Sequence, residues 1–415
     1  MRGVAADLNG IIAAALLALL LSVQPALGRP QLILPHTGIT ANELAVIVND
    51  DDPLSRRIGD YYREARRIPE RNVIHVRFPP GRSALSSDEF AALREQVVRA
   101  TPAHVQAYAV AWTQPYRAGC MALTAALAFG FDPAYCSTAC GPTRASPYFD
   151  STSRYPATNF ALRPAMLLAG TDFEQVRRLI DRGVAADHSF PAGKAWLLST
   201  SDQARNVRAA YFERTVAMLA AVFPVEIHEG NALADPENVL FYFTGLSHVP
   251  DLASLHFLPG ALADHLTSFG GQLTDSSQMS SLRWLEAGAT ASYGTVVEPC
   301  NHPQKFPFPA IALFHYATGA SAVEAYWKSV AWPGEGVFIG EPLARPFAPV
   351  LREISEGQYE LKLFAPQAGN LLFEHSVSPM GPFRRLAQRR PLHRGLNVLR
   401  FALPEQLDGY VRLRW

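Results

Sequence analysis

The sequence predicts an α/β protein with a mostly parallel sheet flanked by helices, followed by a small β-rich module. Short apolar runs alternate with stretches of helical periodicity between residues 43 and 349, which is typical of a parallel sheet covered by helices. Hydrophobic residues make up 48% of the chain and charged residues 18%, so the chain can bury a large core. After Pro349, apolar and polar residues alternate between Gly and Pro turns, which predicts antiparallel strands.

The first part of the large domain has a βαβαβ pattern. We expect strands at 43–49, 72–78 and 105–112, and helices at 55–66 and 87–99. The second helix opens at Ser86 or Ser87 and carries Glu89 in its first turn, which is a capping pattern. Strands that alternate with helices in this way imply helices on both faces of the sheet.

Residues 113–165 interrupt this alternation. They are rich in Pro, Tyr, Ser and Thr and hold three of the four cysteines, so we expect an elaborated, functional loop region. The alternation resumes with helices at 172–182 and 205–221 and strands at 195–199, 225–228 and 239–244. A single large sheet is the economical account, and two half-domains split near residues 165–190 are the alternative.

The last part of the chain completes the domain and adds the module. We expect a helix at 279–287, a strand at 289–294 and helices at 309–318 and 321–327. Residues 350–415 are expected to form a small antiparallel sandwich, with a cluster of arginines on a solvated face: Arg384, Arg385, Arg389, Arg390 and Arg394. The predicted organisation is a signal peptide at 1–28, an α/β domain at 29–349 and a β-rich module at 350–415.

The amino terminus predicts export. Arg2 precedes the apolar run Ile11 to Val23, and the small residues Ala26 and Gly28 follow it, as in a signal peptide. The run is shorter than the roughly 20 residues that a spanning helix needs. We therefore expect a periplasmic or extracellular protein that starts near Arg29. An uncleaved N-terminal anchor is the alternative, and no later stretch is apolar enough to cross a bilayer.

Charge and motifs exclude several classes of function. The chain has 37 basic and 37 acidic residues, so no global field attracts nucleic acid or anionic lipid. It lacks a phosphate-binding loop and a dinucleotide fingerprint, and we predict no cofactor. Asp50 to Asp52 suggest a cation site, but three consecutive carboxylates cannot all face one ion without a sharp turn, and acidic residues before a helix also serve as caps. We predict no metal ion.

The four cysteines, at 120, 136, 140 and 300, suit an oxidising compartment. One or two disulfides are expected, and the sequence does not choose among the three full pairings. Cys136-x3-Cys140 also has zinc-ligand spacing, but a second close pair of ligands is missing.

Two resemblances bear on function. Ala263 to Gly271, Arg283 to Cys300 and Glu324 to Val330 resemble an exported bacterial family found with exosortase-type protein sorting, and the match spans residues 40–349. The resemblance implies sorted surface proteins or exopolysaccharide as partners, and no known reaction.

The second resemblance is remote and covers about a hundred residues. A strand ending in Thr-Gly, then Leu-Thr-Ser-Phe-Gly-Gly, then Ala-Gly-Ala-Thr-Ala-Ser-Tyr-Gly, then Ile-Gly-Glu-Pro-Leu are similar in order to gingipain-type, caspase-like cysteine peptidases. In that family a His ends the first strand and a Cys ends the second. Here Leu246 follows Gly245, His248 is displaced by two positions, and Thr267 and Ser268 stand in the region of the Cys.

Candidate catalytic residues follow from chemistry. Cys300 ends a predicted strand, and His302 or His248 are possible bases for its thiolate. Pairing of Cys300 with another cysteine is the competing interpretation. Ser268 lacks the Gly-x-Ser-x-Gly frame of hydrolases. Asp264 and His265 are adjacent and therefore point apart on a strand or a helix.

Three functions are consistent with these observations. The first is an exported hydrolase of the cysteine-peptidase type that uses Cys300, His248 and His302. The second is a non-catalytic binding or scaffold protein on a caspase-like fold. The third is a metal-dependent hydrolase that uses Asp50 to Asp52.

Overall fold

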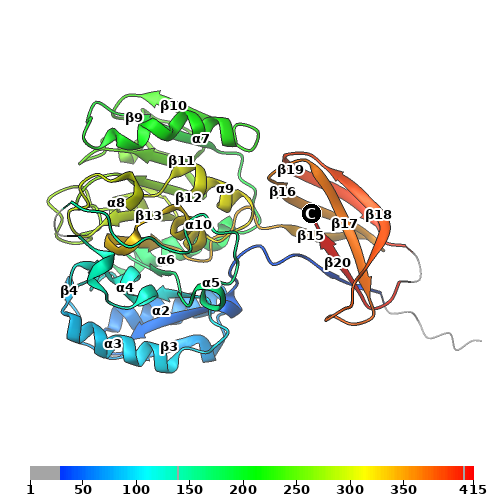
Figure 1. Ribbon diagram of the computed structural model, residues 1–415, viewed down its shortest axis with the longest axis horizontal. Coiled ribbons are helices and arrows are strands. Elements are labelled where there is room, and N and C mark those ends of the chain that lie inside the picture. The colour runs from blue at the N-terminus through cyan, green and yellow to red at the C-terminus, as the bar shows by residue number, and fades with distance from the viewer. Residues whose placement is uncertain (1–28, 138–139, 405–406) are drawn as a thin grey trace, which may run out of the picture.

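The computed structural model describes residues 29–137, 140–404 and 407–415, so the expected signal peptide lies outside the described residues. It contains an α/β domain with a β-rich module beside it, which confirms the predicted fold class (Figure 1). Over the part of the chain described, no helix combines the length and the apolar character needed to cross a bilayer.

A ten-stranded sheet forms the centre of the α/β domain. In sheet order the strands are β10 (Val225–Glu229), β9 (Lys194–Ser199), β11 (Val239–Thr244), β12 (Phe257–His265), β13 (Ala291–Thr295), β14 (Gly336–Gly340), β8 (Ala165–Leu167), β5 (Ala107–Val110), β2 (Leu44–Asn49) and β3 (Val73–Val76). We call β14, β8, β5, β2 and β3 the first block, and β10, β9, β11, β12 and β13 the second block. Strands are parallel within each block.

The two blocks meet in opposite directions. Strands β13 and β14 pair antiparallel, with Ala291 opposite Gly340 and Thr295 opposite Gly336. The sheet is therefore continuous, yet the carboxyl ends of the two blocks lie at opposite edges. The expected single large sheet is therefore present, and its direction reverses between β13 and β14.

The helices cover the two faces of the sheet (Figure 1). They are α2 (Pro53–Arg66), α3 (Ser87–Ala100), α4 (Leu123–Phe129), α5 (Pro156–Phe160), α6 (Phe173–Ala186), α7 (Phe212–Leu219), α8 (Leu282–Ala287), α9 (Pro309–Ala317) and α10 (Ala322–Ser329). Side-chain caps define several of their starts. Asp52 accepts a hydrogen bond from Leu54 N at 2.9 Å, and Ser86 forms a capping box with Glu89.

The region 113–165 is more structured than expected. It contains α4, α5 and two short strands, β6 (Arg117–Ala118) and β7 (Met121–Ala122), which extend β4 (Ala84–Leu85) into a small sheet. Helix α4 was not predicted because Leu123 to Ala128 are all buried, and a helix that is apolar on every face shows no periodicity.

The module is a sandwich of two sheets. One contains β15 (Val350–Ser355), β16 (Gln358–Ala365) and β19 (Gly395–Ala402), and the other has the order β1 (Gln31–Ile33), β20 (Tyr410–Arg414), β17 (Gly369–Ser376), β18 (Arg384–Leu392). Their apolar side chains share a core that includes Leu361, Leu363, Phe373 and Leu413.

Strand β1 belongs to the sandwich, although the sequence analysis places residues 29–349 in the α/β domain. Gln31 pairs in parallel with Tyr410, and Ile33 with Arg412. A three-residue strand carries too little alternation to reveal its partner.

A cluster of aromatic residues joins the sandwich to the α/β domain. The Phe364 ring of β16 lies 5.2 Å from the Phe347 ring, 5.6 Å from the Phe223 ring and 6.1 Å from the Phe190 ring. Contacts of this kind fix two bodies together through buried apolar area.

Candidate functional site

The predicted catalytic residues follow strands of the second block. Strand β11 ends at Thr244, shortly before His248; β12 ends at His265; and β13 ends at Thr295, before Cys300. Parallel strands end at one edge of their sheet, and sites in α/β proteins usually lie at such an edge. The structure therefore brings the relevant strand ends to one side of the domain.

Cys300 is bonded to Cys140, and Cys120 is bonded to Cys136. No described cysteine is free. Because the thiolate is the nucleophilic form of cysteine, the Cys300 sulfur is not a nucleophile in this oxidised state. The bond instead ties the loop around Cys140 to the end of β13.

Neither of the two histidines proposed as bases forms a catalytic dyad with Cys300, whose sulfur is in a disulfide. His302 Nε2 lies 2.7 Å from Cys140 O, so this ring supports the same link between the two loops. His248 is exposed, and its Nδ1 lies 3.4 Å from Ser247 Oγ. Within the described residues, neither histidine contacts a carboxylate that would orient it as a base.

Asp264 and His265 point to opposite faces of β12. Asp264 is buried and accepts a hydrogen bond from Arg208 Nη1 at 2.6 Å. Burial raises the pKa of Asp264 to about 6, although Arg208 opposes the shift. His265 accepts from Trp284 Nε1 at 2.9 Å and lies 3.0 Å from Met279 O. Burial lowers the pKa of His265 to about 3, so it is a neutral imidazole of the core.

Two of the glycine-containing motifs form one close backbone contact. A Cβ at Gly271 would lie 2.5 Å from Gly294 O, and Gly294 in turn packs directly on Gly270. Nearby, Thr295 Oγ1 donates to the carbonyl oxygens of Thr267 and Ser268 at 3.0 and 2.9 Å. Ser268 is buried in this contact. The motifs therefore seat the loop after β12 against β13.

The Gly-Glu-Pro motif is also structural. Glu341 is completely buried and accepts hydrogen bonds from Tyr62 OH at 2.6 Å and Arg66 Nε at 3.0 Å. These contacts attach α2 to the end of β14.

The acidic loop after β2 is occupied by protein partners. Asp50 contacts His75 Nδ1 at 2.7 Å and Arg77 at 3.3 Å, Asp51 contacts Arg77 at 2.9 Å, and Asp52 caps α2. Over the described residues, no group of three or more His, Cys, Asp or Glu side chains is arranged to hold a metal ion.

A cleft that the sequence analysis did not identify lies between the α/β domain and the sandwich. Its volume is about 360 Å³. Its charged or titratable lining consists of Arg154, His36 and His315, and no acidic side chain lines it among the described residues. The apolar walls are Phe314, Phe364, Leu392 and Trp415, and the polar lining includes Thr37, Thr152, Thr318, Gln367 and Asn370.

Arg154 supplies the positive charge of the cleft, because His315 is neutral and His36 Nε2 lies 2.9 Å from Glu43 Oε2. Arg154 Nη1 is buried and has no hydrogen-bond partner among the described residues. Burial would raise the pKa of Glu324, but Lys328, Arg154 and backbone donors outweigh it, so the pKa of this carboxyl is lowered. Glu324 is therefore an anion that attracts Arg154 electrostatically. Burial lowers the pKa of His315 to about 4, although Asp150 lies 3.0 Å from its Nε2.

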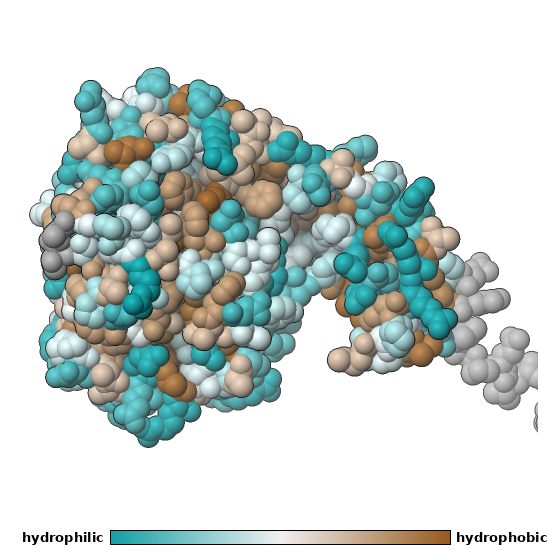
Figure 2. Space-filling model, in the orientation of Figure 1, coloured by the Kyte–Doolittle hydropathy of each residue, from teal (hydrophilic) through white to brown (hydrophobic). Residues whose placement is uncertain are grey.

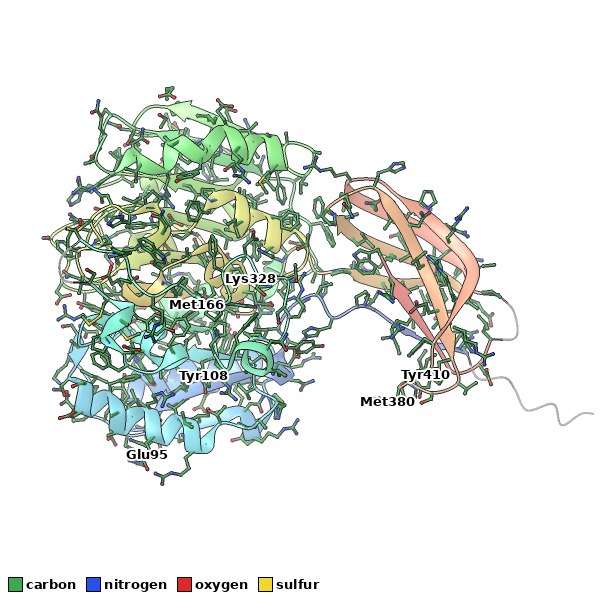
Figure 3. The ribbon with its side chains drawn as sticks, in the orientation of Figure 1. Glu95, Tyr108, Met166, Lys328, Met380 and Tyr410 are labelled. Carbon is green, nitrogen blue, oxygen red and sulfur yellow. A yellow bond between two sulfur atoms is a disulfide. The ribbon has the colours of Figure 1, made fainter. Side chains whose placement is uncertain are left out.

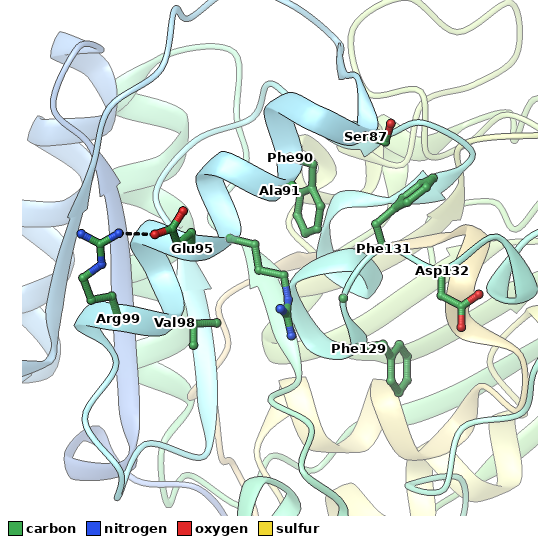
Figure 4. A pocket seen from close by; sticks show the side chains of 11 residues that line it. Ser87, Phe90, Ala91, Glu95, Val98, Arg99, Phe129, Phe131 and Asp132 are labelled. Carbon is green, nitrogen blue, oxygen red and sulfur yellow. Dashed lines mark hydrogen bonds and ion pairs between the residues drawn. The ribbon is translucent and has the colours of Figure 1, made fainter.

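A larger hollow of about 750 Å³ lies between α3 and the residues that follow α4 (Figure 4). Its lining combines Phe129 and Phe131 with charged side chains, of which Glu95 and Arg99 pair with each other. Its two acidic side chains, Glu95 and Asp132, already pair with Arg99 and Arg144 and are not left free for a ligand. We therefore take the interdomain cleft as the candidate site.

Cys300, His248 and His302 were proposed because they follow predicted strands, which a local sequence pattern can reveal. The cleft instead forms where segments far apart in the sequence come together. Pro35 to Thr37, the 152–154 loop, the end of α9 and the β16–β17 turn all contribute to it. One sequence feature pointed towards the cleft, namely Trp415, which follows the alternating run Tyr410 to Arg414.

Comparisons with known proteins do not identify the chain. No protein-family model matches it, and no curated protein is similar to it. A solved structure described as that of a protease aligns with a TM-score of 0.40 and 9% sequence identity, over 88% of this chain and 98% of that chain. A similarity at this level supports no conclusion about activity.

Proposed function

We propose that this protein is an exported binding protein that holds an acidic sugar residue of an envelope polysaccharide in the interdomain cleft. The observation that carries the proposal is the cleft lining: Arg154 with His36 and His315, aromatic walls, and hydroxyl and amide side chains, without an acidic residue. A guanidinium pairs with a carboxylate in a fixed geometry. Aromatic rings cover the apolar faces of sugars, and hydroxyl and amide groups bond to sugar hydroxyls.

Export is supported by two independent features. The first 28 residues have the composition of a signal peptide, and the cysteines form two disulfides, which persist in oxidising compartments. The resemblance to a family found with exosortase-type sorting agrees with exopolysaccharide as the source of the ligand.

The test is calorimetric titration of the mature protein with oligogalacturonate and with a neutral oligosaccharide of similar length. We expect binding of the acidic ligand, weakened by salt. Loss of a charge-assisted contact in Arg154→Gln should weaken binding by about tenfold or more. Arg144→Gln is the matched control, because Arg144 is exposed and pairs with Asp132 away from the cleft.

Thr152→Val provides a second variant of the cleft, because it removes a hydroxyl group from the lining. Thr152 is exposed, so this substitution leaves the core intact. The proposal fails if the neutral ligand binds as well as the acidic one, if neither binds to folded protein, or if Arg154→Gln and Arg144→Gln behave alike.

A second candidate function is a cysteine hydrolase that is active only after reduction. It is favoured by the position of Cys300 after β13, with His302 two residues away and Cys140 exposed at the surface. Alkylation with and without a reductant, read by mass spectrometry, tests it. This candidate requires Cys300 to react faster near neutral pH than Cys120 and Cys136 once reduced, and it is excluded if all four react alike.

A further inference from the structure

The loop that joins β17 to β18 exposes apolar side chains. Val377 is 75% exposed and Met380 is 91% exposed, the two highest values among the large hydrophobic residues described. The loop, Val-Ser-Pro-Met-Gly-Pro-Phe from 377 to 383, contains no charged residue. Figure 3 shows Met380 at the end of the sandwich, close to Tyr410.

The loop holds this shape through its own hydrogen bonds. Gly381 N donates to Ser378 O at 3.0 Å, Met380 N donates to Ser378 Oγ at 3.2 Å, and Ser378 N donates to Ser376 Oγ at 3.1 Å. Gly381 has a φ of 87°, a conformation that favours glycine. The backbone is therefore satisfied while the apolar side chains point outward.

Arginines surround the base of this loop. Arg384 and Arg385 open β18 and are exposed, and Arg412 lies over the Phe383 ring at 4.1 Å. Cross-strand pairing places four arginines on the outer face of the sheet: Arg385, Arg389, Arg412 and Arg414. Glu374 is the acidic residue among them, and it contacts Arg412 at 2.6 Å and Arg414 at 3.5 Å.

The face therefore has a local positive excess in a chain whose formal net charge is zero. Figure 2 shows hydrophilic side chains gathered over β17 and β18, with hydrophobic residues towards the lower end of the sandwich. Three acidic residues described at this end have partners of their own: Glu353 and Glu356 contact Arg29, and Asp408 lies 3.7 Å from His375.

The amino terminus of the described chain lies at the same end. Gln31 N donates to Gly409 O at 2.8 Å, and Gly409 packs on the backbone of Ser376 and Val377. The apolar run Ile11 to Val23 precedes Arg29 in the sequence. A chain that leaves the membrane during export thus enters the fold beside the 377–383 loop.

From these observations we infer that the sandwich docks on a bilayer that contains anionic phospholipid, with Val377 and Met380 inserted among the lipid chains and the basic face against the headgroups. Peripheral proteins bind bilayers through this combination of apolar insertion and basic residues. An acidic polysaccharide would also attract the arginines, but it offers no apolar medium for Val377 and Met380.

The 377–383 loop and the proposed ligand cleft lie at opposite ends of the sandwich. Gly369 and Leu392 lie at the cleft end of β17 and β18, and the 377–383 loop lies at the other end. A strand of 8 residues spans about 25 Å, so the cleft lies about that distance from the 377–383 loop.

The test is cosedimentation of the exported, processed protein with vesicles of phosphatidylcholine, with and without phosphatidylglycerol. We expect binding only to the anionic vesicles, reduced by salt. Val377→Asp with Met380→Asp should abolish it, and Arg385→Gln with Arg389→Gln should weaken it by about tenfold or more. Val98→Asp and Arg400→Gln are the matched controls, because both residues are exposed but lie on α3 and β19.

A second readout follows the loop itself. In the variant Met380→Trp, the fluorescence of the introduced indole should shift to shorter wavelength when anionic vesicles are added. The inference is overturned if folded protein does not bind these vesicles, or if the Asp variants bind them as well as Val98→Asp does. Because none of these variants touches Arg154, the result is independent of the proposed function.

Discussion

A single residue, His265, makes the free energy of unfolding depend on pH. Its ordinary pKa of 6.5 is lowered to about 3 by burial, so the folded protein keeps it neutral while the unfolded chain takes up a proton. The unfolded state then binds more protons below about pH 6.5, and the free energy of unfolding falls as the pH drops, by about 1.4 kcal/mol per pH unit for one such group.

We therefore expect lower stability at pH 5 than at pH 7, measured by urea denaturation. His315, with a pKa of about 4, acts in the same direction, whereas the raised pKa of Asp264 opposes it. In His265→Gln the difference between the two pH values should shrink. The same substitution at exposed His256 is the control, and an unchanged difference in His265→Gln would contradict the explanation.

The buried ion pair between Lys305 and Glu335 gives a second prediction. Their charged atoms are 2.7 Å apart, and both side chains are fully buried. Glu335 also accepts a hydrogen bond from Ser137 N at 2.6 Å. Lys305→Met would leave a buried carboxylate without its cation, so we expect a loss of about 3 kcal/mol in the free energy of unfolding.

The exposed pair Lys194 and Glu226, also 2.7 Å apart, is the control. Lys194→Met should change the free energy of unfolding by less than about 1 kcal/mol. Equal losses in the two variants would show that burial is not the decisive difference.

At the scale of elements, the two disulfides differ in the length of chain that they enclose. Cys140 and Cys300 are separated by 160 residues, and Cys120 and Cys136 by 16. If each bond acts by restricting the unfolded chain, replacing Cys140 and Cys300 by Ala should remove about 5 kcal/mol, and replacing the other pair about 3 kcal/mol. Thermal denaturation of the two double variants checks the order. The reverse order would assign the stabilisation to local contacts instead.

Pattern alone located most strands and helices of the α/β domain, because buried parallel strands and amphipathic helices have strong signatures. Strand β12 was not assigned as a strand. Pro259 and Gly260 interrupt its sequence, and the pairing with β11 shifts register between Val239 and Phe241. Gly260, with a φ of 91°, lies within this irregular segment.

The site was harder to predict than the fold. Cys300 follows a strand and His265 follows Asp264, patterns that also occur at active sites, but a disulfide and a buried hydrogen bond to Trp284 account for them here. The arrangement of the cleft depends on which distant segments meet, and no local pattern encodes that meeting.

At the scale of the whole molecule, Phe364 couples the sandwich to the α/β domain. It is buried and contacts three phenylalanine rings of the other body. Phe364→Ala should lower the free energy of unfolding by about 3 kcal/mol. It should also split one thermal transition into two, measured by calorimetry.

Phe401→Ala, within the sandwich core, is the matched control, since it should destabilise the sandwich without separating the two bodies. A single transition that persists in Phe364→Ala would show that other contacts maintain the coupling.

Because β1 pairs with β20, the sheet that contains both strands can be completed only after the end of the module has been synthesised. The strand that emerges first finds its partner only when Tyr410 to Arg414 have been made and exported. Pro35, His36 and Trp415 then meet across the same cleft. A chain that stops before Tyr410 leaves this sheet without β20 and the cleft without Trp415, so the amino-terminal strand and the cleft both depend on the last residues of the module.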